Sequence, residues 1–242
     1  MRSVLMLVLL VSIVGCARGF DRGALREQLT YEGPVQISDS EIQRALELKP
    51  QLKFPFRLAV YLQRDETERR DYGESFLYSR KWRWEGEDKD NLLSVAEKLR
   101  SEGVVSDMFI IPPSRVTQHE LASIRLAAAE HGADAVLVVN GITDVDRYNN
   151  FASFLYLTVV GMWLVPGTHV DSLFVLDGAM WDVKNQYLYL SVESEGIGSK
   201  TGPQMILKDR DSVVEAKKRA LESFGLELKK RLQAISKVRE AS

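Results

Sequence analysis

The order of apolar patterns between residues 56 and 142 restricts what this chain can fold into more than any other feature of its sequence. Segments in which apolar and polar residues alternate, or in which apolar residues run together, are separated by segments with the spacing of an amphipathic helix. In chain order they predict a strand at 56–62, a helix around 92–99, a strand at 104–111, a helix at 117–132 and a valine-rich central strand at 135–142. This order is a βαβαβ unit, whose right-handed crossovers place the helices against a sheet.

The second helix of this unit has the clearest start signal in the chain. Thr117 and Glu120 have the spacing of a capping box, and Val116 and Leu121 occupy the positions of a hydrophobic staple. Gly132 supplies the matching stop signal. The sequence therefore predicts a helix that Thr117 caps and Gly132 ends.

A β-hairpin is predicted after this unit. Residues 173–182 and 187–193 have strand patterns on either side of a short polar turn. In the second strand, Leu188, Leu190 and Val192 are expected to face the core, because side chains two positions apart point to the same face of a strand.

A long helix is predicted at the C-terminus, from Ser212 onward. Gly225 within it indicates close packing at that turn, because glycine there costs about 1 kcal/mol relative to alanine. The apolar stripe of this helix consists of Leu221, Phe224, Leu228, Leu232 and Ile235. The predicted fold class is α/β, with one sandwich-like domain that combines the βαβαβ unit and the β-hairpin in a mixed sheet, followed by the long C-terminal helix.

The N-terminus has the pattern of a secretory signal peptide. Arg2 precedes an apolar stretch at 4–14, which is too short to span a bilayer, and Gly15 and Cys16 follow it. The Gly-Cys ending resembles the lipobox of bacterial lipoproteins, a family in which the chain is cut before the cysteine and that cysteine is acylated. An ordinary signal peptide with an incidental cysteine is the alternative. Cys16 is the only cysteine of the chain, and its position favours the lipobox.

Acylation of Cys16 would hold the protein on a membrane, because several acyl chains anchor a protein stably where one holds it only marginally. Ala17 follows the cysteine, and by resemblance to enterobacterial sorting rules this favours the outer membrane, facing the periplasm. The mature chain would carry 31 basic and 34 acidic residues, a net charge of -3, since residues 1–15 contain Arg2 as their one charged residue. This balance gives no electrostatic footprint for nucleic acid.

The predicted organisation has four parts. They are a lipoprotein signal peptide at 1–15, a lipidated N-terminus and tether with a short helix at 16–54, an α/β domain with an apolar insert (151–167) at 55–200, and a C-terminal linker and helix at 201–242.

The apolar insert at 151–167 allows three interpretations. It contains no charged residue, and Pro166 and Gly167 end it before it reaches the ~20 residues of a spanning helix. It is either a buried part of the core, or an exposed loop dipping into lipid with Tyr156 and Trp163 at headgroup level, or a surface for a partner or a second copy. The residues predicted for an exposed surface are Phe154, Tyr156, Met162, Trp163 and Leu164.

Three stretches of the chain, together with Cys16, resemble the rhombotarget lipoproteins of bacteria. These stretches are 133–139, 155–167 and 177–183, of which the apolar run closing with Val-Pro-Gly is the most specific. The resemblance implies an envelope lipoprotein without an assigned activity, so it transfers no functional residue. The order of elements is also similar to that of periplasmic lipoproteins of the curli-secretion and penicillin-binding-protein-activator type, which are binding or assembly proteins.

The histidines do not predict a metal site. His119 and His131 share a predicted helix but are 12 residues apart, which does not place them on one face at the spacing of metal ligands. His169 has no metal-ligand pattern around it.

Three other groups of residues each have a functional and a structural interpretation. Asp144, Asp146 and Arg147 follow a central strand, where they form either a carboxylate site or a solvated turn. Residues 196–200 have a superficial likeness to a phosphate loop, and a flexible turn after the hairpin is favoured over it. Basic and aromatic residues alternate at 78–84, either to bind a ligand or as surface cation–π contacts.

Two classes of function follow. The leading one is a non-enzymatic binding or assembly factor of the cell envelope, and the alternative is a periplasmic hydrolase whose site is assembled from distant residues. An exposed Trp163 would favour the first, and a polar cleft near Asp144 or His169 would favour the second. The expected partners are membrane lipid, through acylated Cys16, and an envelope protein or a second copy of the chain. No cofactor, metal or nucleic acid is expected.

Overall fold

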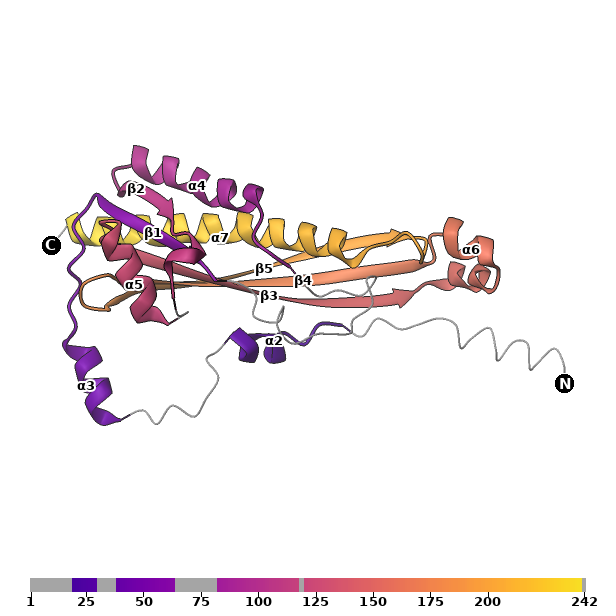
Figure 1. Cartoon of the computed structure of the whole chain (residues 1–242), viewed down its shortest axis with the longest axis horizontal. Helices are drawn as coiled ribbons and strands as arrows, with labels where there is room; N and C mark the ends of the chain where they lie inside the picture. The colour runs from indigo at the N-terminus through magenta and orange to yellow at the C-terminus, as the bar shows by residue number, and fades with distance from the viewer. Residues whose placement is uncertain (1–18, 30–37, 64–81, 118–119, 241–242) are drawn as a thin grey trace.

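A five-stranded mixed sheet organises the structure (Figure 1). The computed structural model describes residues 19–29, 38–63, 82–117 and 120–240. In chain order the elements are α2 (Arg22–Leu29), α3 (Asp39–Glu47), β1 (Phe56–Leu62), α4 (Gly86–Ser101), β2 (Val105–Ile110), the 3-10 helix η2 (Pro113–Arg115), α5 (Leu121–Glu130), β3 (Ala135–Asn149), the 3-10 helix η3 (Phe151–Leu157), α6 (Val159–Leu164), β4 (Thr168–Asp182), β5 (Leu188–Gly202) and α7 (Asp209–Glu240).

The strands are arranged in the order β2-β1-β3-β4-β5. β1 is parallel to both of its neighbours, β2 and β3, and the connections between these three strands run through α4 and α5. β3, β4 and β5 are successive antiparallel neighbours. The predicted βαβαβ unit and β-hairpin are therefore confirmed. Because α7 also lies at the C-terminus as expected, the predicted α/β fold class is confirmed as well.

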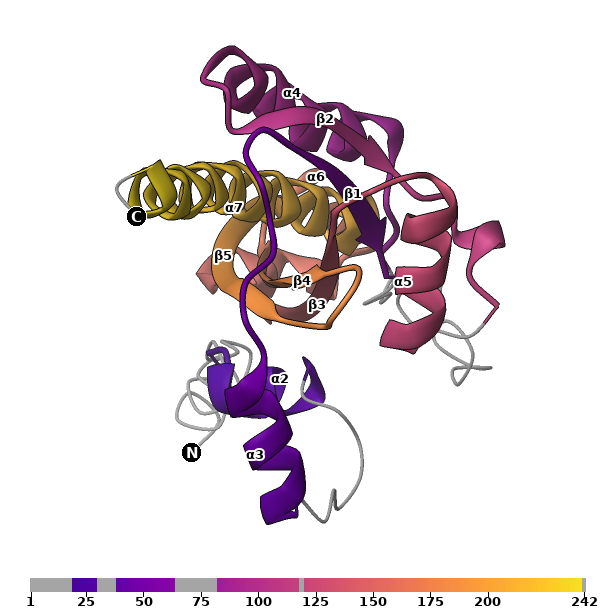
Figure 2. The same ribbon diagram turned by 90° about the vertical axis from the view of Figure 1, so that its left-hand side faces the viewer.

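Helices cover both faces of the sheet (Figure 2). α4 and α7 pack on one face, where Leu92 and Phe224 join the larger hydrophobic core. α5 packs on the opposite face through Ile124. α2 lies on the same face as α5, farther along β3. Val136 packs with α5 and Ile142 packs with α2, and side chains an even number of residues apart point to the same face of a strand.

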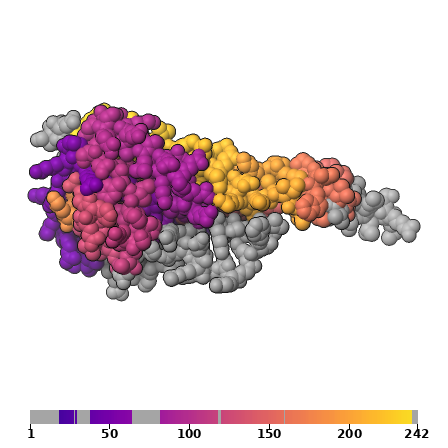
Figure 3. All heavy atoms as spheres, turned by 45° about the horizontal axis from the view of Figure 1, so that its top comes forward, coloured from indigo at the N-terminus to yellow at the C-terminus, as the bar shows by residue number. Residues whose placement is uncertain are grey.

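The three long strands form a narrow ribbon that extends beyond the rest of the sheet (Figure 1), and Figure 3 shows the resulting narrow extension of the molecule, with α7 in yellow along it. β3, β4 and β5 have 15 residues each, while β1 has 7 and β2 has 6. At ~3.3 Å per residue each long strand covers about 50 Å. η3 and α6 close the far end of this ribbon between β3 and β4.

The predicted ends of these strands are wrong, because β3 was expected to stop at 142 and the hairpin to span 173–193. All three strands run on to the ribbon end. The strands continue through segments with polar residues because the helical segments on the two faces of the sheet supply hydrogen-bond and ion-pair partners for these side chains. Arg147 of β3, for example, donates to the Asp209 carboxylate of α7 at 2.8 Å, with both side chains largely buried.

α7 packs along β4 and β5 and supports the ribbon. It begins at Asp209, three residues before the predicted Ser212. A Cβ at Gly225 would lie 2.9 Å from Val95 Cγ2, which confirms close packing at that turn. The predicted apolar stripe is confirmed, with Ile235 partly buried. Its four buried members are Leu221, Phe224, Leu228 and Leu232.

Two local predictions about strand and helix ends are wrong. Leu188 is 43% exposed, because the pairing of β4 with β5 shifts between Met180 and Trp181 and leaves Tyr189 as an extra residue in β5. The capping box of the second helix is not formed either. α5 begins at Leu121, after the turn η2, and no side chain accepts a hydrogen bond at its N-cap.

The segment predicted as a tether, 16–54, contains two helices within its described residues. α3 is the predicted short helix. Its N-cap Ser38 accepts a hydrogen bond from Glu41 N, and Ser38 N donates to Glu41 Oε2 at 2.8 Å, which completes a capping box. α2 is an additional helix, and its Leu25 is buried against the sheet.

Tyr189 fixes the chain between α3 and β1. Its hydroxyl accepts hydrogen bonds from Gln51 N at 3.0 Å and Leu52 N at 2.8 Å, and donates to Asp182 Oδ2 at 2.7 Å. Burial and the bond to Asp182 raise the pKa of Tyr189 from 10.0 to about 12.

The raised pKa of Tyr189 predicts a pH dependence of stability. Above pH 10 the unfolded chain loses this proton while the folded chain keeps it, so the free energy of unfolding should fall as the pH rises from 10.0 toward about 12. Urea unfolding on both sides of pH 10 measures this decline. Tyr189→Phe should show a shallower decline than the parent, and equal slopes would contradict the assignment.

Candidate functional site

The cap at the ribbon end is held by its own backbone and by a few polar side chains. Asn150 N donates to Gly167 O at 2.7 Å, and Asn150 Oδ1 accepts from Ala152 N at 2.9 Å to start η3. Thr158 Oγ1 accepts from Gly161 N at 3.0 Å to start α6. The cap is thus a defined pair of short helices.

Tyr156 lies inside this cap. Its hydroxyl donates to Val165 O at 3.0 Å, accepts from Gly167 N at 2.8 Å and lies 3.1 Å from Thr168 Oγ1. The Tyr156 hydroxyl, for which a position at headgroup level was one expectation, closes the cap through these hydrogen bonds. A Cβ at Gly161 would overlap the carbonyl oxygen of Leu155, so the cap is also tightly packed there.

Apolar side chains point outward from the cap. The exposed fractions are 77% for Leu157, 72% for Leu164 and 48% for Trp163. Of the other predicted surface residues, Phe154, Tyr156 and Met162 are half-buried. The interpretation of residues 151–167 as buried core is wrong, because the cap packs at the end of the ribbon instead of between the layers of the sheet and its helices.

A third segment, which sequence reasoning missed, adds to this surface. Met205 and Ile206 are 40% and 55% exposed, and Met205 N donates to Met162 O at 3.3 Å. Arg147 holds the segment in place through Gln204 O at 2.9 Å. We define the apolar tip by its exposed residues, which are Phe151, Leu155, Leu157, Val160, Trp163, Leu164, Met205 and Ile206.

The predicted group of Asp144, Asp146 and Arg147 is divided between the two faces of β3. Asp146 Oδ2 accepts from Gly19 N at 3.1 Å on the face that α2 covers. Arg147 points to the opposite face, toward α7. The three residues belong to β3, so the solvated turn is wrong, and Asp144 and Asp146 are both buried on one face of that strand.

The described histidines have structural partners. The His169 ring stacks on Tyr148 at 5.4 Å, with its nitrogens 2.7 Å from Thr201 Oγ1 and 3.0 Å from Asn150 Nδ2. His131 Nδ1 lies 2.8 Å from Ala127 O, and His119 lies outside the described residues. Across the described part of the chain, no three His, Cys, Asp or Glu residues are grouped to hold a metal ion.

The two remaining predicted groups are also structural where they are described. Residues 196–200 belong to β5, so the expected flexible turn is wrong. Trp82 is buried against Phe174, with ring centroids 4.8 Å apart, and Trp84 Nε1 donates to Gln63 O at 2.7 Å. Residues 78–81 of the basic-aromatic segment lie outside the described residues.

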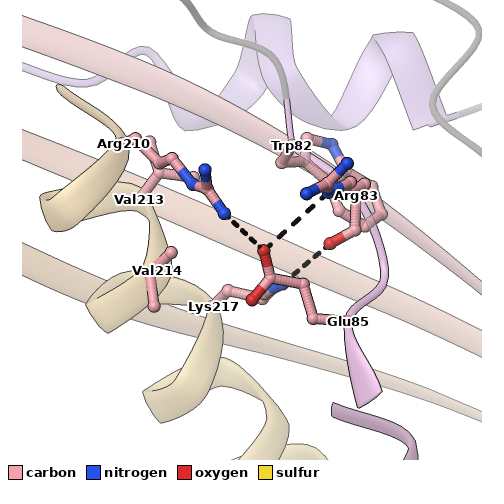
Figure 4. Close-up of a pocket in the computed structure, with 7 residues that line it drawn as sticks. All are labelled: Trp82, Arg83, Glu85, Arg210, Val213, Val214 and Lys217. Atoms are coloured by element: carbon pink, nitrogen blue, oxygen red, sulfur yellow. Dashed lines mark hydrogen bonds and ion pairs between the residues drawn. The ribbon is translucent and has the colours of Figure 1, made fainter. Parts of the chain in front are cut away.

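A pocket lies between α7 and the segment that precedes α4 (Figure 4). Each cationic group there has a carboxylate partner. Arg210 lies 2.8 Å and Arg83 3.9 Å from Glu85 Oε1, and Lys217 Nζ lies 2.6 Å from Asp88 Oδ2. The three cations thus share two carboxylates, because Arg83 and Arg210 both contact Glu85. The full lining consists of Trp82, Arg83, Glu85, Arg210, Val213, Val214 and Lys217.

No protein-family model matches the chain, and no curated protein sequence matches it. Solved structures give distant similarities. PelC, a dodecamer from Paraburkholderia phytofirmans, is 17% identical, with a TM-score of 0.30 over 74% of this chain and 88% of that one. A DUF330 protein from Xanthomonas campestris is 13% identical, with a TM-score of 0.34 over 81% of this chain and 94% of that one. A lipoprotein from Neisseria meningitidis is 13% identical, with a TM-score of 0.28 over 61% and 84%. These values do not assign a function.

Among the described residues, no helix has the length and hydropathy needed to cross a bilayer.

Proposed function

We propose that the protein is a lipid-anchored lipoprotein of the bacterial cell envelope that acts as a non-enzymatic binding or assembly factor through its apolar tip. The observation that carries the proposal is the exposure of this surface, with Leu157 and Leu164 more than 70% exposed. Exposed apolar surface that is gathered in one place is typical of a site that contacts another molecule.

The membrane part of the proposal rests on the sequence. Cys16 is the proposed site of acylation and lies outside the described residues. Ala17 supports placement in the outer membrane, facing the periplasm. The proposal also retains the resemblance to rhombotarget-type lipoproteins, and the looser one to lipoproteins of the curli-secretion type.

The enzymatic alternative has less support. Asp146 and His169, which lie where a hydrolase site was considered, are engaged with a backbone N–H group, a threonine and an asparagine. Arg147 points to the other face of the sheet and is paired there. A binding role uses the exposed surface that is present, whereas an enzyme would need these groups to converge.

The first test is photocrosslinking in intact cells from a photoreactive residue at position 157. The matched control places it at Leu126 of α5, an apolar position that is 63% exposed, and α5 lies at the other end of the molecule from α6 (Figure 1). A defined lipid or protein adduct from position 157, and none from position 126, supports the proposal. Equal adducts from both positions, or none from position 157, would contradict it.

The second test addresses the anchor alone. Cys16→Ser is expected to prevent acylation and release the protein from the membrane fraction, because the acyl chains supply stable anchoring. The measurement is fractionation of cells, with detection of the protein and of its size. If Cys16→Ser matures and fractionates like the parent, the proposed anchoring is wrong.

A further inference from the structure

The described N-terminal residues are docked along the ribbon in a fixed direction. Three contacts show this. They join Gly19 N to Asp146 Oδ2 at 3.1 Å, Arg22 Nε to Glu195 Oε2 at 3.0 Å and Arg26 Nε to Glu193 Oε1 at 2.6 Å. In the sheet register Asp146 is level with residue 199 of β5, so the three acceptors lie progressively farther from the tip. Gly19 is therefore the end of the segment nearest the tip, and α2 runs away from it (Figure 1).

Apolar contacts hold this segment as well. Leu25 is 6% exposed and packs on Leu173 and Val175, and Phe20 and Leu29 are partly buried beside it. Residues 19–29 are thus part of the folded ribbon. The distance between the anchored cysteine and the ribbon is set by the short stretch that precedes Gly19.

That stretch is short enough to restrict where the bilayer can lie. Cys16 precedes Gly19 by three residues, which span about 11 Å at most. Along β3, the three residues from Asp146 to Asn149 cover ~10 Å and end at the cap. The opposite end of β3, at Ala135, is about 36 Å from Asp146, which is beyond the reach of Cys16. The acyl chains must therefore enter the bilayer near the tip end of the ribbon.

We propose that the apolar tip inserts into the same bilayer leaflet that holds the acyl chains, so that the ribbon stands on the membrane at two points. This inference rests on the proposed acylation of Cys16 and names the bilayer as the partner of the tip. The chemistry of the tip fits this partner, because residues 150–168 contain no Asp, Glu, Lys or Arg. Trp163 beside aliphatic side chains suits the boundary between headgroups and acyl chains.

The absence of Lys and Arg from residues 150–168 also indicates which lipids are needed. Membrane contacts built on basic residues depend on anionic lipid and weaken in salt. Contact through the apolar tip should instead form on zwitterionic phosphatidylcholine and persist when the salt concentration is raised.

The test uses the mature protein, acylated at Cys16, reconstituted in phosphatidylcholine vesicles that contain brominated acyl chains, which quench tryptophan fluorescence at short range. Trp163 is the reporter, and Trp163→Phe identifies its share of the signal beside Trp82, Trp84 and Trp181. We expect brominated lipid to quench a component that is lost in Trp163→Phe. Equal quenching in both proteins, or no quenching in the parent, overturns the inference.

Variants with charged residues in the apolar tip distinguish insertion of the tip into the bilayer from a tip that only lies near the membrane. Leu157→Asp with Leu164→Asp should abolish the quenching of Trp163, because both exposed side chains would carry a charge into lipid. Leu126→Asp with Leu226→Asp, at positions 63% and 71% exposed on α5 and α7, should leave it unchanged. Unfolding midpoints equal to the parent confirm that the variants fold, and quenching that survives in the tip variant contradicts insertion.

The outcome is distinct from failure of the proposed function. A specific protein adduct from position 157 without quenching of Trp163 would leave the binding factor standing and reject the bilayer as its partner. Loss of both the adduct and the quenching would reject both proposals.

Discussion

Gly198→Ala is expected to lower the free energy of unfolding by at least ~3 kcal/mol, at the upper end of the range for overpacked sites. A Cβ at Gly198 would overlap the carbonyl oxygen of Ser212 and lie 2.7 Å from Ala216 N. Both atoms belong to the backbone of α7, so no flexible side chain can move away. The helix would have to lift from β5 and weaken the neighbouring hydrogen bonds that Ser194 donates to Ala220 O and that link Ser172 to Ser212.

The matched control for this prediction is Gly202→Ala on the same strand. A Cβ there would meet Leu207 Cδ1 at 3.4 Å, an ordinary contact distance, so the change in stability should stay within ~1 kcal/mol. Urea unfolding followed by circular dichroism measures both variants. If Gly198→Ala and Gly202→Ala unfold alike, the close approach of α7 to β5 is not what holds this end of the ribbon.

The same glycines show why part of the fold escapes local reasoning. Gly196 and Gly198 read as a turn because glycine is frequent in turns, and no neighbour in sequence indicates that α7 crosses them. The βαβαβ unit, by contrast, was predicted from local patterns, since helical spacing and apolar or alternating runs can be recognised within each segment. The extension of the strands into the ribbon was not predicted, because the partners of its polar residues are far away in the sequence. Arg147 is polar because it faces Asp209, a partner 62 residues away.

The sequence identified the segment that forms the candidate site, but it did not decide whether that segment is buried or exposed. The uncharged segment at 151–167 could be recognised without a structure. Its exposure depends on how far β3 and β4 extend beyond the shorter strands β1 and β2. Tyr156 was expected at the surface because aromatic residues are frequent at membrane and partner interfaces, and the cap uses its hydroxyl internally. Met205 and Ile206 lie about 40 residues from the cap, so only the packing of the linker against α6 reveals them.

Lys217→Met is expected to lower the free energy of unfolding by about 3–5 kcal/mol, because it leaves a buried carboxylate without its counter-ion. The Lys217 side chain is 3% exposed, and its ammonium group donates to Asp88 Oδ2 at 2.6 Å and to Arg83 O at 2.8 Å. Asp88 also accepts from Glu85 N at 2.7 Å at the start of α4. The ion pair thus joins α7 to the first turn of α4 across one layer of the domain.

A double-mutant cycle separates the ion pair from the packing of the long lysine side chain. Asp88→Asn leaves an unpaired ammonium group and should also be strongly destabilising, although asparagine keeps an acceptor for Glu85 N. Asp88→Asn with Lys217→Met removes both charges, and it should be at least ~2 kcal/mol more stable than the sum of the single changes predicts. Additive effects in urea unfolding would show that the two charges do not stabilise each other. The junction of α4 and α7 would then depend on its apolar contacts, such as Gly225 against Val95.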